Sequence, residues 1–233
     1  MMRWGAPAPH RIPDLDPEPG TRNENVMSKP YLHVTARDGW GAAVADELAA
    51  APEFSVAQEA ALPEAAGYLV VAAHENTDLL SARDRLAFGL RRPWAPLILT
   101  ASGVRLGPVV VPGRSACYQC FLRRWLQHDP QGEHTAAMLR DDRAIPAHSV
   151  AGHLPSDVLI GSGLARALAE AIADGFGGRV QPGDVVRFSV AGGTVRRDRV
   201  IAVPGCRRCG PRRDRAADTW QGLALALGAN NDG

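Results

Sequence analysis

The chain has 233 residues, enough for one large domain, and hydrophobic residues make up 45% of it. Its 26 basic and 25 acidic residues nearly cancel, which excludes a protein that binds nucleic acid or an anionic membrane through overall charge. No hydrophobic run reaches the roughly 20 residues of a membrane span and no secretion signal opens the chain, so a cytoplasmic location is expected.

The first half of the chain predicts alternating strands and helices after a proline-rich start. Residues 1–28 contain five prolines, and we expect them to be a disordered extension, with Met27 as an alternative start of translation. Hydrophobic patterning predicts strands at 31–35, 54–57 and 68–73, and helices at 42–50 and 77–90. Residues 38–41, Asp-Gly-Trp-Gly, predict a turn between the first strand and the first helix.

The second half predicts two strand pairs separated by a helix. Strands are expected at 96–100 and 104–111, a helix at 155–173, and a final hairpin at 185–190 and 195–203. Residues 121–150 are polar and predict a crossing loop with a helical piece near 136–140. The alternation predicts an α/β fold with a doubly wound, Rossmann-like, mostly parallel sheet. We assign this domain to residues 29–211 and a polar tail to residues 212–233.

Two CxxC pairs are the strongest chemical signal in the sequence. Cys117 and Cys120 form the first pair, and Cys206 and Cys209 form the second. Two residues between cysteines let a tight turn direct both sulfurs to one ion, and four thiolates complete a structural zinc shell with no open position for catalysis. Two unrelated buried pairs, or a redox-active CxxC, are the alternatives.

The segments around these cysteines resemble a known family. Residues 106–117, LGPVVVPGRSAC, are similar to the signature GP-x-V-x-PG-[RT]-x-x-C-x-x-C, and residues 203–210, VPGCRRCG, match the closing P-x-C-x-x-C-G. These motifs belong to the ThiF-like subfamily of peptide-natural-product clusters, within the ThiF/MoeB-type, ubiquitin-activating-like superfamily. The resemblance covers about residues 30–211.

The resemblance implies positions for an ATP site. Gly39 and Gly41 stand where the family has its glycine-rich phosphate turn, Glu59 where it has a ribose-binding acid, and Glu75 with Asn76 where it has a magnesium pair. Turn geometry explains the glycines equally well, and ordinary loop-end roles are the preferred interpretation of the other three residues. No Lys or Arg lies between residues 37 and 83 to neutralise phosphates, so ATP is not expected as a cofactor.

The resemblance therefore implies a non-catalytic, degenerate partner in the biosynthesis of ribosomal thiazole- and oxazole-modified peptides. Its expected partners are a YcaO-type cyclodehydratase and the precursor peptide. Larger family members carry a leader-binding winged-helix module, which this chain has no room for, so a separate leader-binding protein is a further candidate partner. Many ThiF-like folds dimerise, and a homodimer is also considered.

Two other functions stay open. One is an active ATP-dependent adenylyltransferase acting on a peptide or carrier-protein C-terminus, and the other is a zinc-stapled module with a regulatory role. The candidate interaction surfaces are the loop with Arg123, Arg124, Trp125 and His128, and the tail around Trp220. His128, His134 and His148 could form a second metal or catalytic set, although surface residues are the preferred interpretation.

Overall fold

The computed structural model describes residues 31–56, 63–140 and 152–210. The expected N-terminal extension and C-terminal tail lie outside these residues. The strands are Leu32–Ala36 (β1), Phe54–Val56 (β2), Gly67–Ala72 (β3), Trp94–Thr100 (β4), Gly103–Leu106 (β5), Asp184–Ser189 (β6) and Thr194–Arg199 (β7). The helices are Asp38–Ala49 (α1), Thr77–Leu90 (α2), Tyr118–His128 (α3), Gly132–Arg140 (α4) and Pro155–Ala173 (α6).

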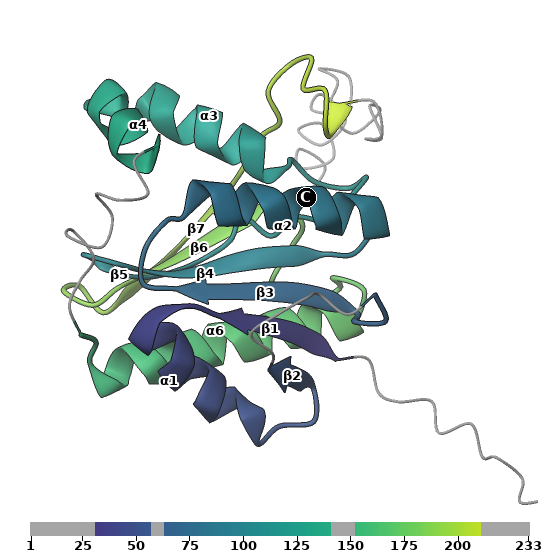
Figure 1. Ribbon diagram of the computed structural model, residues 1–233, viewed down its shortest axis with the longest axis vertical. Coiled ribbons are helices and arrows are strands. Elements are labelled where there is room, and N and C mark those ends of the chain that lie inside the picture. The colour runs from purple at the N-terminus through teal and green to yellow at the C-terminus, as the bar shows by residue number, and fades with distance from the viewer. Residues whose placement is uncertain (1–30, 57–62, 141–151, 211–233) are drawn as a thin grey trace, which may run out of the picture.

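One seven-stranded sheet, in the order β2-β1-β3-β4-β5-β6-β7, organises the described residues (Figure 1). The three pairings from β2 to β4 are parallel, and the three from β4 to β7 are antiparallel. The expectation of a mostly parallel sheet is therefore wrong for the second half. Short turns join β4 to β5 and β6 to β7, and such turns connect antiparallel neighbours only. The third antiparallel pair, β5 with β6, is joined instead by the long connection that contains α3, α4 and α6.

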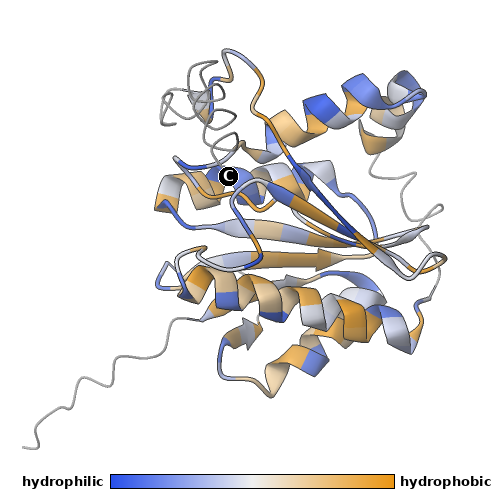
Figure 2. Cartoon of the chain, turned by 180° about the vertical axis from the view of Figure 1, so that it is seen from behind, coloured by the Kyte–Doolittle hydropathy of each residue, from blue (hydrophilic) through white to orange (hydrophobic). Residues whose placement is uncertain are grey.

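Helices cover both faces of this sheet, so the fold is mixed α/β with two hydrophobic layers. Helices α1 and α6 pack on one face, where Val44, Leu48 and Leu168 are fully buried. Helices α2 and α3 lie on the other face, with Leu80 and Tyr118 in its core. Figure 2 shows hydrophobic central strands and, in contrast, a hydrophilic edge at β7. Among the described helices, none has the length and hydrophobicity needed to cross a membrane.

Three local expectations are wrong. The predicted turn at residues 38–41 is the first turn of α1, which begins at Asp38. The strand predicted at 104–111 ends at Leu106, because Gly107 has a φ of 102° and turns the chain. The first part of the polar loop predicted at 121–150 is helical instead, because Phe121 and Trp125 repeat along one side of α3 and pack together, while Arg123 points to solvent. The helical piece expected near 136–140 is confirmed as part of α4, and residues 141–150 lie outside the described residues.

Candidate metal centre and neighbouring polar sites

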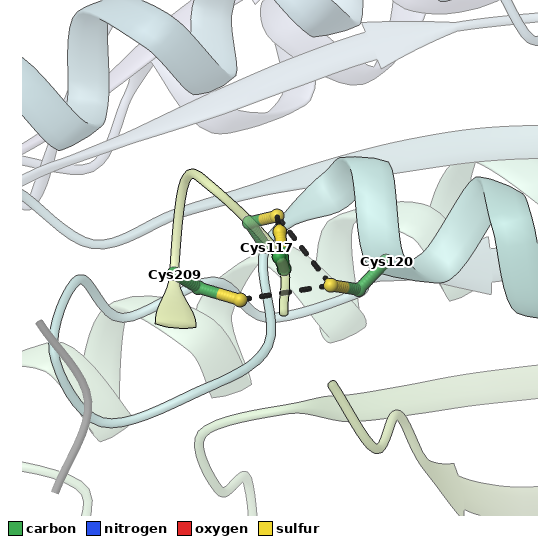
Figure 3. Close-up of side chains that lie close together, drawn as sticks. Cys117, Cys120 and Cys209 are labelled. Atoms are coloured by element: carbon green, nitrogen blue, oxygen red, sulfur yellow. Dashed lines mark hydrogen bonds between the residues drawn. The ribbon is translucent and has the colours of Figure 1, made fainter. Parts of the chain in front are cut away.

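Two loops that are distant in sequence bring the four cysteines together. Cys117 precedes α3 and Cys120 lies in its first turn, whereas Cys206 and Cys209 follow β7. The Sγ atom of Cys117 is 3.8 Å from that of Cys120 and 3.7 Å from that of Cys206. The Sγ atoms of Cys120 and Cys209 are 3.6 Å apart (Figure 3). All four side chains are buried, and their sulfurs lie within 4.8 Å of one another, so the predicted meeting of the two pairs is confirmed.

The sulfur spacing fits one tetrahedral metal ion. Sulfurs held at about 2.3 Å from a tetrahedral ion lie about 3.8 Å from each other. The measured neighbour distances of 3.6 to 3.8 Å agree with this value. Hydrogen bonds from Cys117 and Cys209 lower the pKa of Cys120, whereas the pKa values of Cys117 and Cys209 are raised, so the cluster favours one thiolate, at Cys120, and a thiolate is the form that binds metal. The four cysteines are thus compatible with a closed metal site.

A buried carboxylate connects the two cysteine loops to the sheet. Asp84 of α2 is fully buried, and its Oδ1 accepts hydrogen bonds from the backbone N–H of Tyr118 (3.3 Å) and the indole N–H of Trp94 (3.2 Å). Its Oδ2 lies 3.4 Å from Nε of Arg208, in the second CxxC pair. Burial raises the pKa of Asp84, and these donors and Arg208 offset part of that effect. Asp84 therefore positions both halves of the metal centre.

A carboxylate occupies the predicted glycine-rich turn. Asp38 has a φ of 61°, in the left-handed region that aspartate tolerates better than most residues. Its Oδ1 accepts the N–H of Gly41 at 3.0 Å, and its Oδ2 accepts the N–H of Ala73, at the end of β3, at 2.6 Å. Backbone N–H groups in such a turn are the groups that bind phosphate in nucleotide sites. In this chain the protein's own carboxylate accepts these hydrogen bonds.

The two glycines of the turn have different surroundings. A Cβ added to Gly39 would have no atom within 4 Å, whereas one added to Gly41 would lie 2.7 Å from the carbonyl oxygen of Val71. Gly41 is therefore required for the close packing of α1 on β3. Gly39 has no such packing constraint.

Glu75 and Asn76, the two residues predicted to bind magnesium, are both hydrogen-bonded within the protein. Glu75 is buried, forms an ion pair with Arg105 of β5, and accepts a hydrogen bond from the hydroxyl of Tyr118 at 2.5 Å. Burial and the negative charge of Glu75 raise the pKa of Tyr118 well above its usual value, so the hydroxyl stays protonated. Asn76 is the N-cap of α2 and accepts the N–H of Leu79 at 2.8 Å. Glu59 lies outside the described residues.

The candidate interaction residues gather on α3 rather than on a loop. The guanidinium of Arg105 lies 4.8 Å from the ring centroid of Phe121 and 5.9 Å from that of Trp125. Arg124 is half-buried, and His128 is exposed near the end of the helix. His134 is exposed on α4, while His148 and Trp220 lie outside the described residues. The three histidines are therefore not shown to form a site.

Known structures provide the comparison for this arrangement. The heterocyclase TruD aligns with a TM-score of 0.58 and 25% identity, over 79% of this chain and 28% of TruD. A heterocyclase solved with substrate and cofactor aligns with a TM-score of 0.58 and 19% identity, over 78% of this chain and 25% of that one. MccB of E. coli, solved with MccA, aligns with a TM-score of 0.57 and 13% identity, over 79% and 67% of the two chains.

These similarities show a fold shared with heterocyclases and with MccB. The chain spans about a quarter of the length of the two heterocyclases. No family model matches the chain, and no curated protein matches it.

The sequence analysis does not predict the roles of three polar residues in these sites, which are Asp38, Asp84 and Arg105. The sequence places Asp38 only in a turn, and its hydrogen bonds depend on the N–H of Ala73, which is 35 residues away. Asp84 and Arg105 carry no local motif. A charged residue in a mostly hydrophobic strand, such as Arg105, is the one signal that indicates a buried partner.

Proposed function

We propose that the protein is a non-adenylating, ThiF-like partner that assists a YcaO-type cyclodehydratase in forming thiazole or oxazole rings on a ribosomal precursor peptide. The observation that carries this proposal is the similarity to the heterocyclase TruD over 79% of the chain. We also propose that the sheet, with helices on both faces, is the doubly wound, Rossmann-like arrangement of that family.

The polar contacts around the predicted nucleotide site support a non-catalytic role. The carboxylate of Asp38 accepts the N–H groups of Gly41 and Ala73, so an incoming phosphate would meet a negative charge. Glu75 is paired with Arg105 and is buried, so it is not free to hold magnesium. Bound ATP would lack both its anion-binding turn and its metal ligand, which favours a structural role for the domain.

We propose zinc as the metal of the four-cysteine site. An all-sulfur tetrahedral set is typical of structural zinc, and a closed shell leaves no position for a reacting water. The ion would join the start of α3 to the segment after β7, with Cys117, Cys120, Cys206 and Cys209 as ligands. Its chemical contribution would be to stabilise this end of the fold.

The proposed partners are the YcaO-type enzyme, the precursor peptide and, where required, a separate leader-binding protein in the cytoplasm. The test is to co-express the tagged protein with the cognate enzyme and precursor and to measure complex formation by size-exclusion chromatography with light scattering. The same measurement on the protein alone gives its own oligomeric state and tests the homodimer. We expect a stable complex with the enzyme, and the absence of any complex at micromolar concentrations would contradict the proposal.

An active adenylyltransferase is the second candidate. The specific observation in its favour is the fold similarity to MccB solved with ATP, with a TM-score of 0.56 and 12% identity. Exchange of labelled pyrophosphate into ATP that depends on a peptide or carrier-protein C-terminus would establish this activity. The non-adenylating proposal predicts no exchange above the level of a blank without protein.

A further inference from the structure

A groove separates α3 from the last two strands of the sheet. Hydrophobic side chains of α3 form one wall, and side chains of β6, β7 and the residues after β7 form the other. The residues that carry the inference are Phe121, Arg124, Trp125, Arg187, Arg196 and Ile201. The groove lies on the sheet face opposite α1 and α6, and the predicted nucleotide turn does not line it.

A row of arginines crosses the sheet at this groove. Arg105 of β5, Arg187 of β6 and Arg196 of β7 are direct cross-strand neighbours. Glu75 neutralises Arg105, whereas Asp198 accepts hydrogen bonds from both Arg187 (2.6 Å) and Arg196 (2.9 Å). Three guanidinium groups therefore share two carboxylates. Positive charge is in excess at the β7 end of the row, where the side chain of Arg196 is 78% exposed.

The opposite wall carries one further arginine and one carboxylate. Arg124 of α3 lines the groove, and its buried Nε atom has no hydrogen-bond partner among the described residues. Asp129 also lines the groove, and hydrogen bonds from the hydroxyl of Thr135 (2.6 Å) and the N–H of Gln131 (2.9 Å) keep its carboxylate ionised. Positive charge still exceeds negative charge in the groove, because its lining includes Arg199 and the three arginines Arg124, Arg187 and Arg196 against the two carboxylates of Asp129 and Asp198. The charge of the groove is thus complementary to an acidic ligand.

The edge of the sheet gives the groove a second binding element. β7 is the last strand in the sheet order, and among the described strands it pairs with β6 alone. Its outer backbone N–H and C=O groups are therefore available to a further strand. Val195 is 65% exposed and Ile201 is 69% exposed, so hydrophobic contacts are also available beside this edge.

We propose that the β7 edge and the adjoining groove bind an extended acidic peptide segment, which adds to the sheet as a strand beside β7. Backbone pairing would supply affinity, and alternate side chains would give specificity, with carboxylates directed into the groove to Arg196 and Arg124 and apolar groups directed to Val195 on the other face of the sheet. This inference rests on the proposed function for the identity of the ligand as a peptide. It adds to the proposed function the chemistry of the bound peptide segment, which is extended and acidic.

The test uses a fluorescein-labelled peptide of about eight residues that alternates glutamate and valine. We expect saturable binding by fluorescence anisotropy, weakened by added salt. Reversing one charge on each wall, Arg124→Glu with Arg196→Glu, is expected to weaken binding about tenfold. The matched control is Arg85→Glu with Arg179→Glu, which reverses two exposed arginines that do not line the groove and should change binding less than about twofold.

Further measurements separate the proposed binding mode from its alternatives. Methylating alternate amide nitrogens of the peptide should abolish binding, because it removes the donors that pair with β7. Equal loss in the groove and control variants, full binding by the methylated peptide, or tighter binding of oligothymidylate would overturn the proposal. The milder change Arg124→Gln with Arg196→Gln should give an intermediate loss, and circular dichroism checks that each variant is folded.

The outcome is distinguishable from that of the proposed function. A protein that binds the acidic peptide but forms no complex with the YcaO-type enzyme would support the groove and contradict the function. Complex formation without peptide binding would contradict the groove alone.

Discussion

The two glycines of the Asp-Gly-Trp-Gly turn should respond in opposite ways to substitution by alanine. In Gly41→Ala, the new Cβ would lie 2.7 Å from the carbonyl oxygen of Val71. That oxygen also accepts the N–H of Arg37 at 2.8 Å, so it cannot move without weakening the hydrogen bond that leads into α1. Overpacking of this kind costs about 1–3 kcal/mol, and the gain in helix propensity returns about 1 kcal/mol at most.

The net expectation for Gly41→Ala is a loss of about 1–2 kcal/mol in the free energy of unfolding, or roughly 2–8 °C in melting temperature. Gly39→Ala is the matched control, because nothing lies within 4 Å of its added Cβ. It should leave stability unchanged or raise it by up to about 1 kcal/mol. Urea unfolding followed by circular dichroism measures both. Equal effects in the two variants, or a stabilising Gly41→Ala, would refute the packing role assigned to Gly41.

Three further predictions follow from the buried polar contacts and the cysteine cluster. Glu75→Gln leaves the charge of Arg105 buried without a compensating carboxylate and should lower the free energy of unfolding by about 3–5 kcal/mol. The control Glu53→Gln, which breaks an exposed ion pair, should lower it by less than about 1 kcal/mol in the same urea experiment. Cys206→Ser should reduce the metal content, measured by mass spectrometry, from one ion per chain towards zero, and should lower the melting temperature. A strong chelator added to the unsubstituted protein should have the same two effects. Normal stability of the protein without metal would contradict a structural metal site. Asp38→Ala leaves two backbone N–H groups without their carboxylate and should lower the free energy of unfolding by about 2 kcal/mol, measured by thermal unfolding. Magnesium-ATP should not stabilise the unsubstituted protein. A clear rise in its melting temperature on addition of ATP would argue for a working nucleotide site.

Local signals in the sequence predict two helices to the residue. α2 spans Thr77–Leu90 and α6 spans Pro155–Ala173, as expected. The side chain of Asn76 caps the first of these helices, and a proline begins the second, so both starts are determined by residues at the boundary itself. The meeting of the two CxxC pairs could also be predicted, because each pair alone already has the spacing of a metal site.

Contacts between distant segments explain what could not be predicted. The sequence favours a loop over α3 because polar residues surround Phe121 and Trp125, whose helical spacing is the one signal of the helix. The arginine row depends on the register of β5, β6 and β7, which places Arg105 beside Arg187 across 82 residues of sequence. The hydrogen bonds of Asp38 likewise require α1 and the end of β3 to meet in the folded protein. Neither the strand register nor the hydrogen bonds of Asp38 have a local sequence signature.

The proposed partner role is best tested by the rate of ring formation by the cognate YcaO-type enzyme, measured with and without this protein. Mass spectrometry follows the loss of one water from the precursor peptide for each ring formed, with ATP supplied throughout. We expect the rate to rise with the concentration of this protein until the enzyme is saturated. The variant Asp38→Asn, which removes the charge at the nucleotide turn, should support the same maximum. A rate that does not respond to the protein at any concentration would rule out the proposed partner role.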